Sequence, residues 1–293
     1  MKDFDKKVNT PSESADSGRV KKSRVVIRLD AVGSAENGGG KASAQAKPDE
    51  RTVDAGFDIL HEDNHIIVVV KPRNIPTQAD KSGDDDMLTK IKAYLIKKYN
   101  KPGDAYVGLL HRLDRPTGGV MVFAKTSKAA SRISEQIREE EVEKTYCAVT
   151  VGRPNRVGRI EHYLEKNEKT NTVSVVPFTV EGAKKAVSNI TVLDENDGLN
   201  LVRVELLTGR SHQARVQLNA LGAPIVGDTK YAGDKLVKCP YLALWAYKLS
   251  FSHPVTGDIM TFFAQPPDEF PWNLFDTAAL VTSARPTDRT EKK

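Results

Sequence analysis

Three short segments of the chain place polar residues beside apolar ones, and each could supply groups for chemistry. In the first segment, Asp114 lies between two arginines and is followed by Pro116, so its carboxylate is expected on an irregular loop at the end of a strand. Such a carboxylate can face a cleft and act as a nucleophile or a general base. It could equally cap a surface turn and pair with Arg112 or Arg115.

The second segment, residues 208–218, reads Thr-Gly-Arg-Ser-His-Gln-Ala-Arg-Val-Gln-Leu and predicts the start of a helix. His212 and Arg215 are three positions apart, so both project from the same side of that helix. Together with Arg210 at the helix N-terminus, they could hold a phosphate or a carboxylate. A solvent-exposed basic helix face would give the same pattern.

The third segment contains Tyr146 in an otherwise apolar strand. Its ring could stack on a nucleobase while its hydroxyl binds a polar partner. Packing in the hydrophobic core is the alternative for a tyrosine in such a strand. None of the three segments decides by itself between a functional site and ordinary structure.

The elements that must position these segments indicate an α+β domain. Apolar, β-branched residues at 59–60 and 65–70 predict a hairpin that turns at Asp63-Asn64 and ends at Pro72. Irregular mixing of strands and helices favours an α+β architecture over a repeated βαβ parallel sheet. Further strands are expected at 120–124, 146–151 and 201–206, and helices around Leu88, Ile91 and Leu95, around Ala129, Ile133 and Ile137, and around Ala214, Leu218 and Leu221.

Composition predicts three parts along the chain. Residues 1–54 are rich in Ser, Lys, Asp, Gly and Ala, contain one apolar cluster at 25–27, and are expected to form a flexible arm. Residues 55–272 carry the periodic apolar pattern of one folded domain, and residues 273–293 are expected to form a polar tail. With 39% hydrophobic residues, a chain of this length can build a substantial core.

Charge and cysteine content narrow the function classes. The net charge of +5 suits a polyanionic partner without requiring one. No apolar run approaches the roughly 20 residues of a membrane span, and the N-terminus does not resemble a signal peptide, so a soluble, cytoplasmic protein is expected. Cys147 and Cys239 lack the close spacing of a metal or redox pair and are expected to be reduced, structural thiols.

Six motifs, in order, resemble the signatures of RluA-type RNA pseudouridine synthases, and the resemblance covers roughly residues 57–268. They are His-Glu-Asp-Asn-His with Val-Val-Val-Lys-Pro (61–72), His-Arg-Leu-Asp (111–114), Lys-Thr-Tyr (144–146), Thr-Gly-Arg-Ser-His-Gln-Ala-Arg (208–215), Gly-Ala-Pro-Ile-Val-Gly-Asp-Thr-Lys-Tyr (222–231) and Leu-Trp-Ala-Tyr-Lys-Leu-Ser-Phe-Ser-His-Pro (244–254). The order of the motifs also matches that of the family.

The resemblance implies an α+β pseudouridine synthase fold, with a mixed, mostly antiparallel sheet, flanking helices and a central RNA-binding cleft. It makes Asp114 the catalytic aspartate, Arg215 its ion-pair partner, and Tyr146 the ring that stacks on the target base. The family breaks the N-glycosidic bond, turns the uracil and rejoins it through carbon 5, without a cofactor or a metal. A monomer acting on ribosomal or transfer RNA is expected. Substrate contacts are expected from His111, Arg112, Arg210, His212, Gln213 and Leu244.

The chain departs from the usual family pattern at two positions. Gly118 follows Thr117 where many members have serine, and Ala214 stands where a larger aliphatic residue is usual. Neither change removes a charged or aromatic group with an expected role, so only fine pocket geometry is affected. The arm also lacks the S4-type RNA-binding domain of many relatives, which predicts a different substrate range.

Two other functions are compatible with parts of the sequence. A catalytically inactive RNA-binding or folding helper could keep the cleft, but it would be expected to have lost Asp114, Tyr146 or Arg215. A metal-dependent hydrolase could use His111, Asp114 and His212 as ligands, although their spacing matches no compact ligand motif. Activity that survives a strong chelator would exclude the hydrolase.

Overall fold

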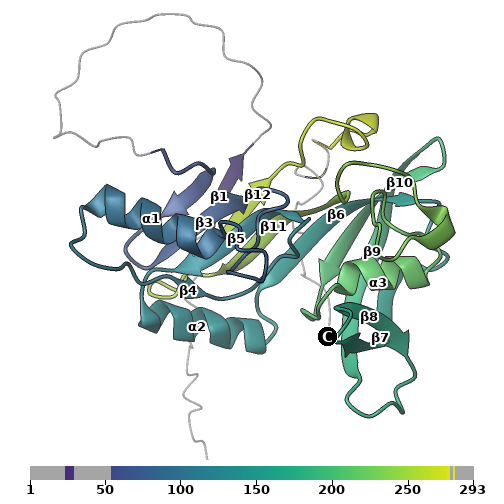
Figure 1. The fold of residues 1–293 in the computed structure, drawn as a ribbon, viewed down its shortest axis with the longest axis horizontal. Coiled ribbons are helices and arrows are strands. Elements are labelled where there is room, and N and C mark those ends of the chain that lie inside the picture. Colours follow the sequence, from purple (N-terminus) through teal and green to yellow (C-terminus); the bar gives the residue numbers. More distant parts are fainter. Residues whose placement is uncertain (1–23, 30–53, 278–279, 281–293) are drawn as a thin grey trace, which may run out of the picture.

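The computed structural model describes residues 24–29, 54–277 and 280. These residues form one mixed β-sheet, three α-helices and two short 3-10 helices (Figure 1). The strands are β1 (Arg24–Leu29), β2 (Ile59–Glu62), β3 (Ile66–Lys71), β4 (Gly108–Leu109), β5 (Gly118–Ala124), β6 (Glu143–Val151), β7 (Gly158–Asn167), β8 (Thr172–Val176), β9 (Lys184–Asn196), β10 (Leu199–Leu206), β11 (Leu244–Ser252) and β12 (Ile259–Ala264). The helices are α1 (Met87–Tyr99), α2 (Ser127–Arg138), α3 (Gln213–Ala220), η1 (Gly233–Lys235) and η2 (Trp272–Leu274).

Most neighbouring strands of the sheet run antiparallel. The order along the sheet is β2-β3-β5-β11-β6-β10-β9-β7-β8, while β4 pairs with β5, and β12 pairs with β11 and β1. Parallel pairing joins β5 to β11 and β1 to β12. The predicted α+β architecture, with a mixed, mostly antiparallel sheet and flanking helices, is therefore confirmed.

The predicted hairpin is formed by β2 and β3, which pair antiparallel. Asp63 makes its turn, because Oδ1 of Asp63 accepts hydrogen bonds from the backbone N–H groups of His65 at 2.6 Å and Ile66 at 2.9 Å. Every residue of β3 is buried. An unbroken run of β-branched residues fits a strand that is covered on both faces.

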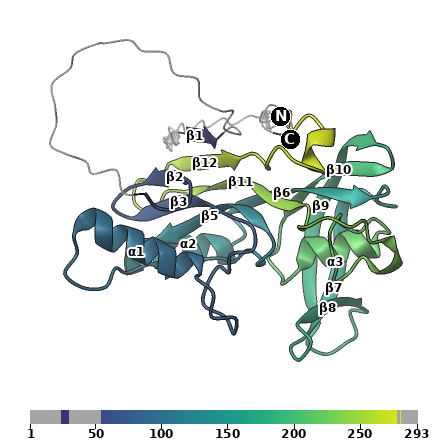
Figure 2. The same ribbon diagram turned by 45° about the horizontal axis from the view of Figure 1, so that its top comes forward.

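The three predicted helices are present, and Figure 2 shows them on the same side of the sheet. Helix α1 begins at Asp86, whose side chain accepts from the Thr89 N–H at 3.1 Å. Helix α2 begins in the same way at Thr126, which accepts from the Ala129 N–H at 3.2 Å. These caps satisfy N–H groups that the helices themselves leave free.

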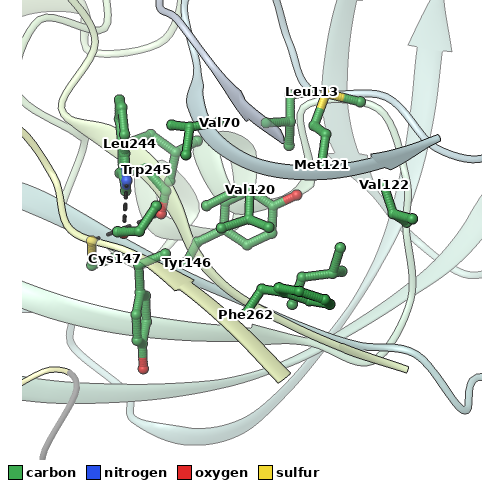
Figure 3. Close-up of a cluster of buried hydrophobic side chains, with 14 of the residues drawn as sticks. Val70, Leu113, Val120, Met121, Val122, Tyr146, Cys147, Leu244, Trp245 and Phe262 are labelled. Atoms are coloured by element: carbon green, nitrogen blue, oxygen red, sulfur yellow. Dashed lines mark hydrogen bonds between the residues drawn. The ribbon is translucent and has the colours of Figure 1, made fainter. Parts of the chain in front are cut away.

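The core contains a close approach of β5 to β11 at two glycines. A Cβ on Gly118 would lie 2.2 Å from the Trp245 ring, and a Cβ on Gly119 would lie 2.2 Å from the Ala246 carbonyl oxygen. Trp245 thus fills the space that any side chain at Gly118 would need. Figure 3 shows this part of the core, where the labelled side chains include Val70, Val120, Tyr146, Leu244 and Trp245.

Strand β1 lies inside the segment that the sequence predicted to be a flexible arm. Residues 24–29 pair in parallel with β12, so the apolar cluster at 25–27 belongs to a strand and the expectation of flexibility does not hold there. The rest of the arm up to residue 53 and most of the polar tail lie outside the described residues, and the division of the chain into three parts stays a prediction. No helix among the described residues is long and apolar enough to cross a membrane.

Candidate active site

A cleft of about 900 Å³ lies between the loop that follows β4 and the N-terminus of α3. Its volume is in the range of small-ligand pockets, and its lining combines apolar residues with many charged ones. Positive charge exceeds negative charge on this lining, which attracts a polyanion. The cationic side chains are Arg112, Arg115, Lys144, Lys166, Arg210, Arg215 and Lys230, and the acidic ones are Asp80 and Asp114.

Asp114 occupies a loop whose backbone is fixed on both sides. Thr77 Oγ1 donates to the Leu113 carbonyl oxygen at 2.9 Å and accepts from the Leu113 N–H at 3.3 Å. On the other side, Lys71 Nζ donates to the Arg115 carbonyl oxygen at 3.1 Å. The Asp114 side chain remains 26% exposed and lines the cleft. The loop therefore holds the carboxylate in place without covering it.

Lys71 is a fully buried lysine at the end of β3. Besides the Arg115 carbonyl, its Nζ donates to the carbonyl oxygens of Pro72 at 2.9 Å and Ile75 at 2.6 Å. These three acceptors match the three donors of an ammonium group. Burial lowers the pKa of Lys71 to about 7, although the charge of Asp114 acts to raise it. Lys71 thus ties the segment after β3 to the Asp114 loop.

The arginines on either side of Asp114 do not pair with it. Arg115 forms ion pairs with Asp84 and, at 3.7 Å, with Asp80. Arg112 is exposed on the cleft lining and makes no hydrogen bond or ion pair with the described residues. The alternative that the sequence left open, in which Asp114 pairs with Arg112 or Arg115, is therefore wrong, although a backbone turn does join Asp114 to Thr117.

Arg215 brings two carboxylates together from the first turn of α3. Its Nε and Nη2 donate to the two carboxylate oxygens of Asp228 at 2.9 and 2.7 Å, and its Nη1 donates to Asp114 Oδ2 at 3.4 Å. Burial acts to lower the pKa of Arg215, but the hydrogen bonds and charges of Asp228 and Asp114 outweigh burial and raise that pKa. The guanidinium therefore stays cationic beside Asp114.

Asp228 fixes the orientation of this guanidinium. Its side chain is 1% exposed, and Oδ1 also accepts from the backbone N–H groups of Lys230 at 3.1 Å and Tyr231 at 3.2 Å. The two-point contact between Asp228 and Arg215 leaves Nη1 directed at Asp114. Asp228 thus determines where Arg215 presents its charge.

Tyr146 on β6 lines the cleft, with 9% of its surface exposed. Burial raises the pKa of its hydroxyl, and the charge of Asp114 acts in the same direction, so the hydroxyl stays protonated. Lys144 lies two residues earlier and lines the same cleft, because alternate residues of a strand share a face. The ring of Tyr146 and the carboxylate of Asp114 therefore line the same cleft.

His111 also lines the cleft and supports β5. Its Nε2 accepts from the Val122 N–H at 3.2 Å. Burial lowers the pKa of His111 to about 4, and the charge of Lys144 acts in the same direction. The imidazole is therefore neutral at neutral pH, which it must be to accept that hydrogen bond.

The loop before α3 is held by the buried side chain of Gln213. Its Oε1 accepts from the Thr208 hydroxyl at 2.8 Å and from the Arg210 N–H at 3.0 Å, while its Nε2 donates to the Val187 carbonyl at 3.0 Å. His212, the N-cap residue of α3, has a left-handed backbone with φ of 52°. Its Nδ1 lies 2.5 Å from the Tyr231 hydroxyl. Arg210 and His212 both line the cleft.

Comparison with known proteins identifies the family. A model of the family described as RNA pseudouridylate synthase matches residues 65–220, which include the Asp114 loop, β6 and α3. The chain belongs to this family. It is an RNA pseudouridine synthase, an isomerase that acts on RNA.

Relatives of this synthase support the assignment over most of the chain. A ribosomal large subunit pseudouridine synthase D of Vibrio parahaemolyticus is 31% identical, over 77% of this chain and 73% of the relative. An uncharacterized RNA pseudouridine synthase of Bacillus subtilis is 34% identical, over 70% of this chain and 67% of the relative. The solved structure of human RNA pseudouridylate synthase domain containing 4 shares the fold, with a TM-score of 0.62, 24% identity and coverage of 74% of this chain and 91% of that one.

Most site residues named from the sequence of this synthase line one cleft. The residues on its lining are Asp114, Arg215, Tyr146, His111, Arg112, Arg210 and His212. Gln213 and Leu244 are not on the lining. The polar atoms of Gln213 are used by the loop that they support, and Leu244 is 4% exposed within the core cluster around Tyr146 (Figure 3).

Sequence reasoning missed the groups that support the site from behind, which are Asp228, Lys71 and Thr77. Asp228 and Lys71 stand in the motifs that carry the family resemblance, and a carboxylate after Gly227 is a signal that could have been used. Thr77 gives no signal, because its contact with Leu113 joins residues 36 positions apart. Among the described residues, no group of three or more His, Cys, Asp or Glu side chains is arranged to hold a metal ion.

Proposed function

We propose that this synthase converts uridines of ribosomal RNA to pseudouridine, with Asp114 as the catalytic carboxylate. Ribosomal RNA is the substrate in the names of several relatives, including synthase D of Vibrio parahaemolyticus and Pseudomonas aeruginosa. The proposal includes a monomer that acts in the cytoplasm. Residues 55–272 form the catalytic domain, with an N-terminal arm and a C-terminal tail.

One observation carries the proposal. Asp114 is a partly exposed carboxylate that lines a basic cleft, and it meets a buried arginine at 3.4 Å. The Arg215 guanidinium places a fixed positive charge beside this carboxylate, and the exposed part of the carboxylate faces the cleft in which the target nucleotide would bind.

The other lining residues provide the binding that the reaction needs. The uracil must leave its stack, which costs a few kcal/mol, and the ring of Tyr146 offers a replacement stacking surface. The N1–C1′ bond breaks, the uracil turns within the cleft, and a C5–C1′ bond forms. The proton lost from C5 is balanced by the proton gained at N1, so the product is an isomer. His111, Arg112, Arg210 and His212 contact the nucleotide and its phosphates.

The test is to incubate purified protein, treated with a chelator, with ribosomal and transfer RNA transcripts and to map pseudouridine at single-nucleotide resolution. Asp114→Asn should bind RNA but lose more than about a thousandfold in rate, since it keeps the shape and removes the carboxylate. Asp80→Asn is the matched control, because Asp80 is an exposed carboxylate of the same cleft, paired with Arg115. Turnover by Asp114→Asn would contradict the proposed role. Tight RNA binding by the wild type without any modified site would favour the helper function.

A further inference from the structure

Tyr231 stands at the junction of three elements that border the cleft, and it has no role in the function proposed above. Its hydroxyl accepts from the Val173 N–H on β8 at 3.0 Å and lies 2.5 Å from His212 Nδ1. Its ring centre is 5.0 Å from the guanidinium carbon of Arg215. The hairpin of β7 and β8, the N-cap of α3 and the Arg215 guanidinium therefore meet at one tyrosine.

The hydrogen bonds at this hydroxyl indicate where its proton can go. Because the Val173 N–H can only donate, the Tyr231 oxygen is the acceptor in that bond. The proton of the hydroxyl then needs an acceptor of its own, and among the described residues the partner within reach is Nδ1 of His212. Nδ1 accepts this proton only when it carries none itself. In a neutral His212, this arrangement requires the hydrogen on Nε2.

The Nε2 side of His212 is open to the cleft. His212 lines the cleft, and its Nε2 makes no hydrogen bond within the described part of the chain. Burial lowers the pKa of His212, the charges of Arg215 and Lys230 act in the same direction, and Asp114 and Asp228 oppose them. The ring thus offers a neutral N–H donor close to the carboxylate.

The backbone conformation of His212 also indicates that neighbouring residues hold its ring in one position. A φ of 52° is uncommon outside glycine and costs on the order of 1 kcal/mol. The hydrogen bonds of Gln213 with Thr208 and Arg210 stabilise this backbone turn, and the Tyr231 hydroxyl contacts the ring at Nδ1. These contacts hold the position of the ring in the protein without RNA.

We propose that Tyr231 is a positioning residue that holds His212 as its Nε2–H tautomer, so that His212 donates a hydrogen bond to an oxygen of the target nucleotide. This inference rests on the proposed function. Arginine and lysine can also donate to oxygen, but they bring a positive charge that competes for Asp114. A neutral donor can bind an oxygen of the nucleotide and leave the pairing of Asp114 with Arg215 undisturbed.

The tautomer can be read directly by long-range proton–nitrogen NMR on protein labelled with nitrogen-15 histidine, with His212→Gln used to assign the signals. The wild type should show His212 with its hydrogen on Nε2, and Tyr231→Phe should show a mixture of the two tautomers. Phenylalanine keeps the ring beside Arg215 and removes only the hydroxyl. Tyr163→Phe is the matched control on the same hairpin, because Tyr163 packs on Phe178 and its hydroxyl has no hydrogen-bond partner among the described residues.

Single-turnover rates at saturating enzyme then test the donor. Tyr231→Phe should slow pseudouridine formation about fivefold to tenfold, with the RNA Kd unchanged and Tyr163→Phe at the wild-type rate. His212→Gln keeps an N–H donor and should stay within about threefold of the wild type, whereas the similarly sized His212→Met should lose about tenfold or more.

Three results would overturn the inference. They are a wild-type His212 with its hydrogen on Nδ1, a Tyr231→Phe protein whose tautomer and rate both equal those of Tyr163→Phe, and equal rates for His212→Gln and His212→Met. Failure of the proposed function would look different, because wild type and Asp114→Asn would then both form no pseudouridine. The NMR measurement would still report the tautomer in that case.

Discussion

Asp228 and Asp114 both contact the guanidinium of Arg215, but the two carboxylates differ in their burial and in the number of hydrogen bonds that they accept. The side chain of Asp228 is buried, and its carboxylate accepts two hydrogen bonds from Arg215 and two from backbone N–H groups. The loop that carries Asp114 is open to the cleft, and its carboxylate meets Arg215 at a single distance of 3.4 Å. The Asp228 carboxylate thus accepts four hydrogen bonds, whereas the Asp114 carboxylate can still accept hydrogen bonds from a substrate.

The difference means that Asp228 holds Arg215 in place, whereas Asp114 can contact a substrate. Because Asp228 already orients Arg215, the guanidinium does not depend on Asp114 for its position. The carboxylate of Asp114 can therefore turn to a substrate while its own backbone stays fixed by Thr77 and Lys71. The buried ion pair of Arg215 with Asp228 stabilises the site, and the less tightly held carboxylate of Asp114 is the one that we propose for the reaction.

Removal of the shared arginine should have the largest effect on this arrangement. Arg215→Met leaves Asp228 buried without its cationic partner, so the free energy of unfolding should fall by about 3–5 kcal/mol and the rate by more than about a thousandfold. Urea unfolding and pseudouridine formation measure the two effects. Arg210→Met is the matched control, because Arg210 is exposed at the same end of α3, and it should weaken RNA binding without loss of stability. Equal stability of the two variants would show that the buried pair is not important for folding.

Neutralising each carboxylate in turn should separate the two regions. Asp228→Asn should lower the free energy of unfolding by about 3 kcal/mol, since it weakens charged hydrogen bonds in a buried site. Asp114→Asn should change it by less than about 1 kcal/mol, because its one contact is long and partly exposed. Urea unfolding of both proteins at neutral pH gives the comparison. If Asp114→Asn were the less stable of the two, the division of roles between the carboxylates would be wrong.

The sequence predicted the fold and the residues that face the cleft better than the residues that support them. Strands and helices follow from periodic apolar residues, which is why the hairpin at Asp63 and the helix that begins after Asp86 were expected where they occur. The facing residues were found because the family resemblance covers their motifs. The roles of Lys71 and Thr77 depend on contacts between segments that are distant along the chain, and no local pattern reports such contacts. The strand at residues 24–29 was missed for the same reason, since its partner is β12.

The backbone that follows the Asp114 loop should tolerate no added volume. Gly118→Ala places a methyl group against the Trp245 ring and should lower the free energy of unfolding by about 1–3 kcal/mol. Gly103→Ala is the matched control, because a Cβ there meets nothing within 4 Å. Thermal or urea unfolding of both proteins tests the difference. Wild-type stability of Gly118→Ala would mean that Trp245 moves aside at little cost.

The anchor at His111 should make the stability of the protein depend on pH. Burial holds the pKa of His111 at about 4 in the folded protein, below its ordinary value of 6.5, so the unfolded chain binds more protons between these values. The stability that neutral His111 contributes is complete above about pH 6.5 and is lost as the pH falls toward 4, by at most about 3 kcal/mol.

His111→Gln supplies an oxygen that can accept from the Val122 N–H and does not titrate. The difference in unfolding free energy between wild type and His111→Gln, measured in urea at pH 8 and at pH 4.5, should therefore shift in favour of the variant at the lower pH. A difference that stays constant between the two pH values would show that His111 is not held neutral by the fold. The Asp114 loop would then be connected to β5 less firmly than its hydrogen bonds indicate, and the contrast with the Asp228 turn would be weaker.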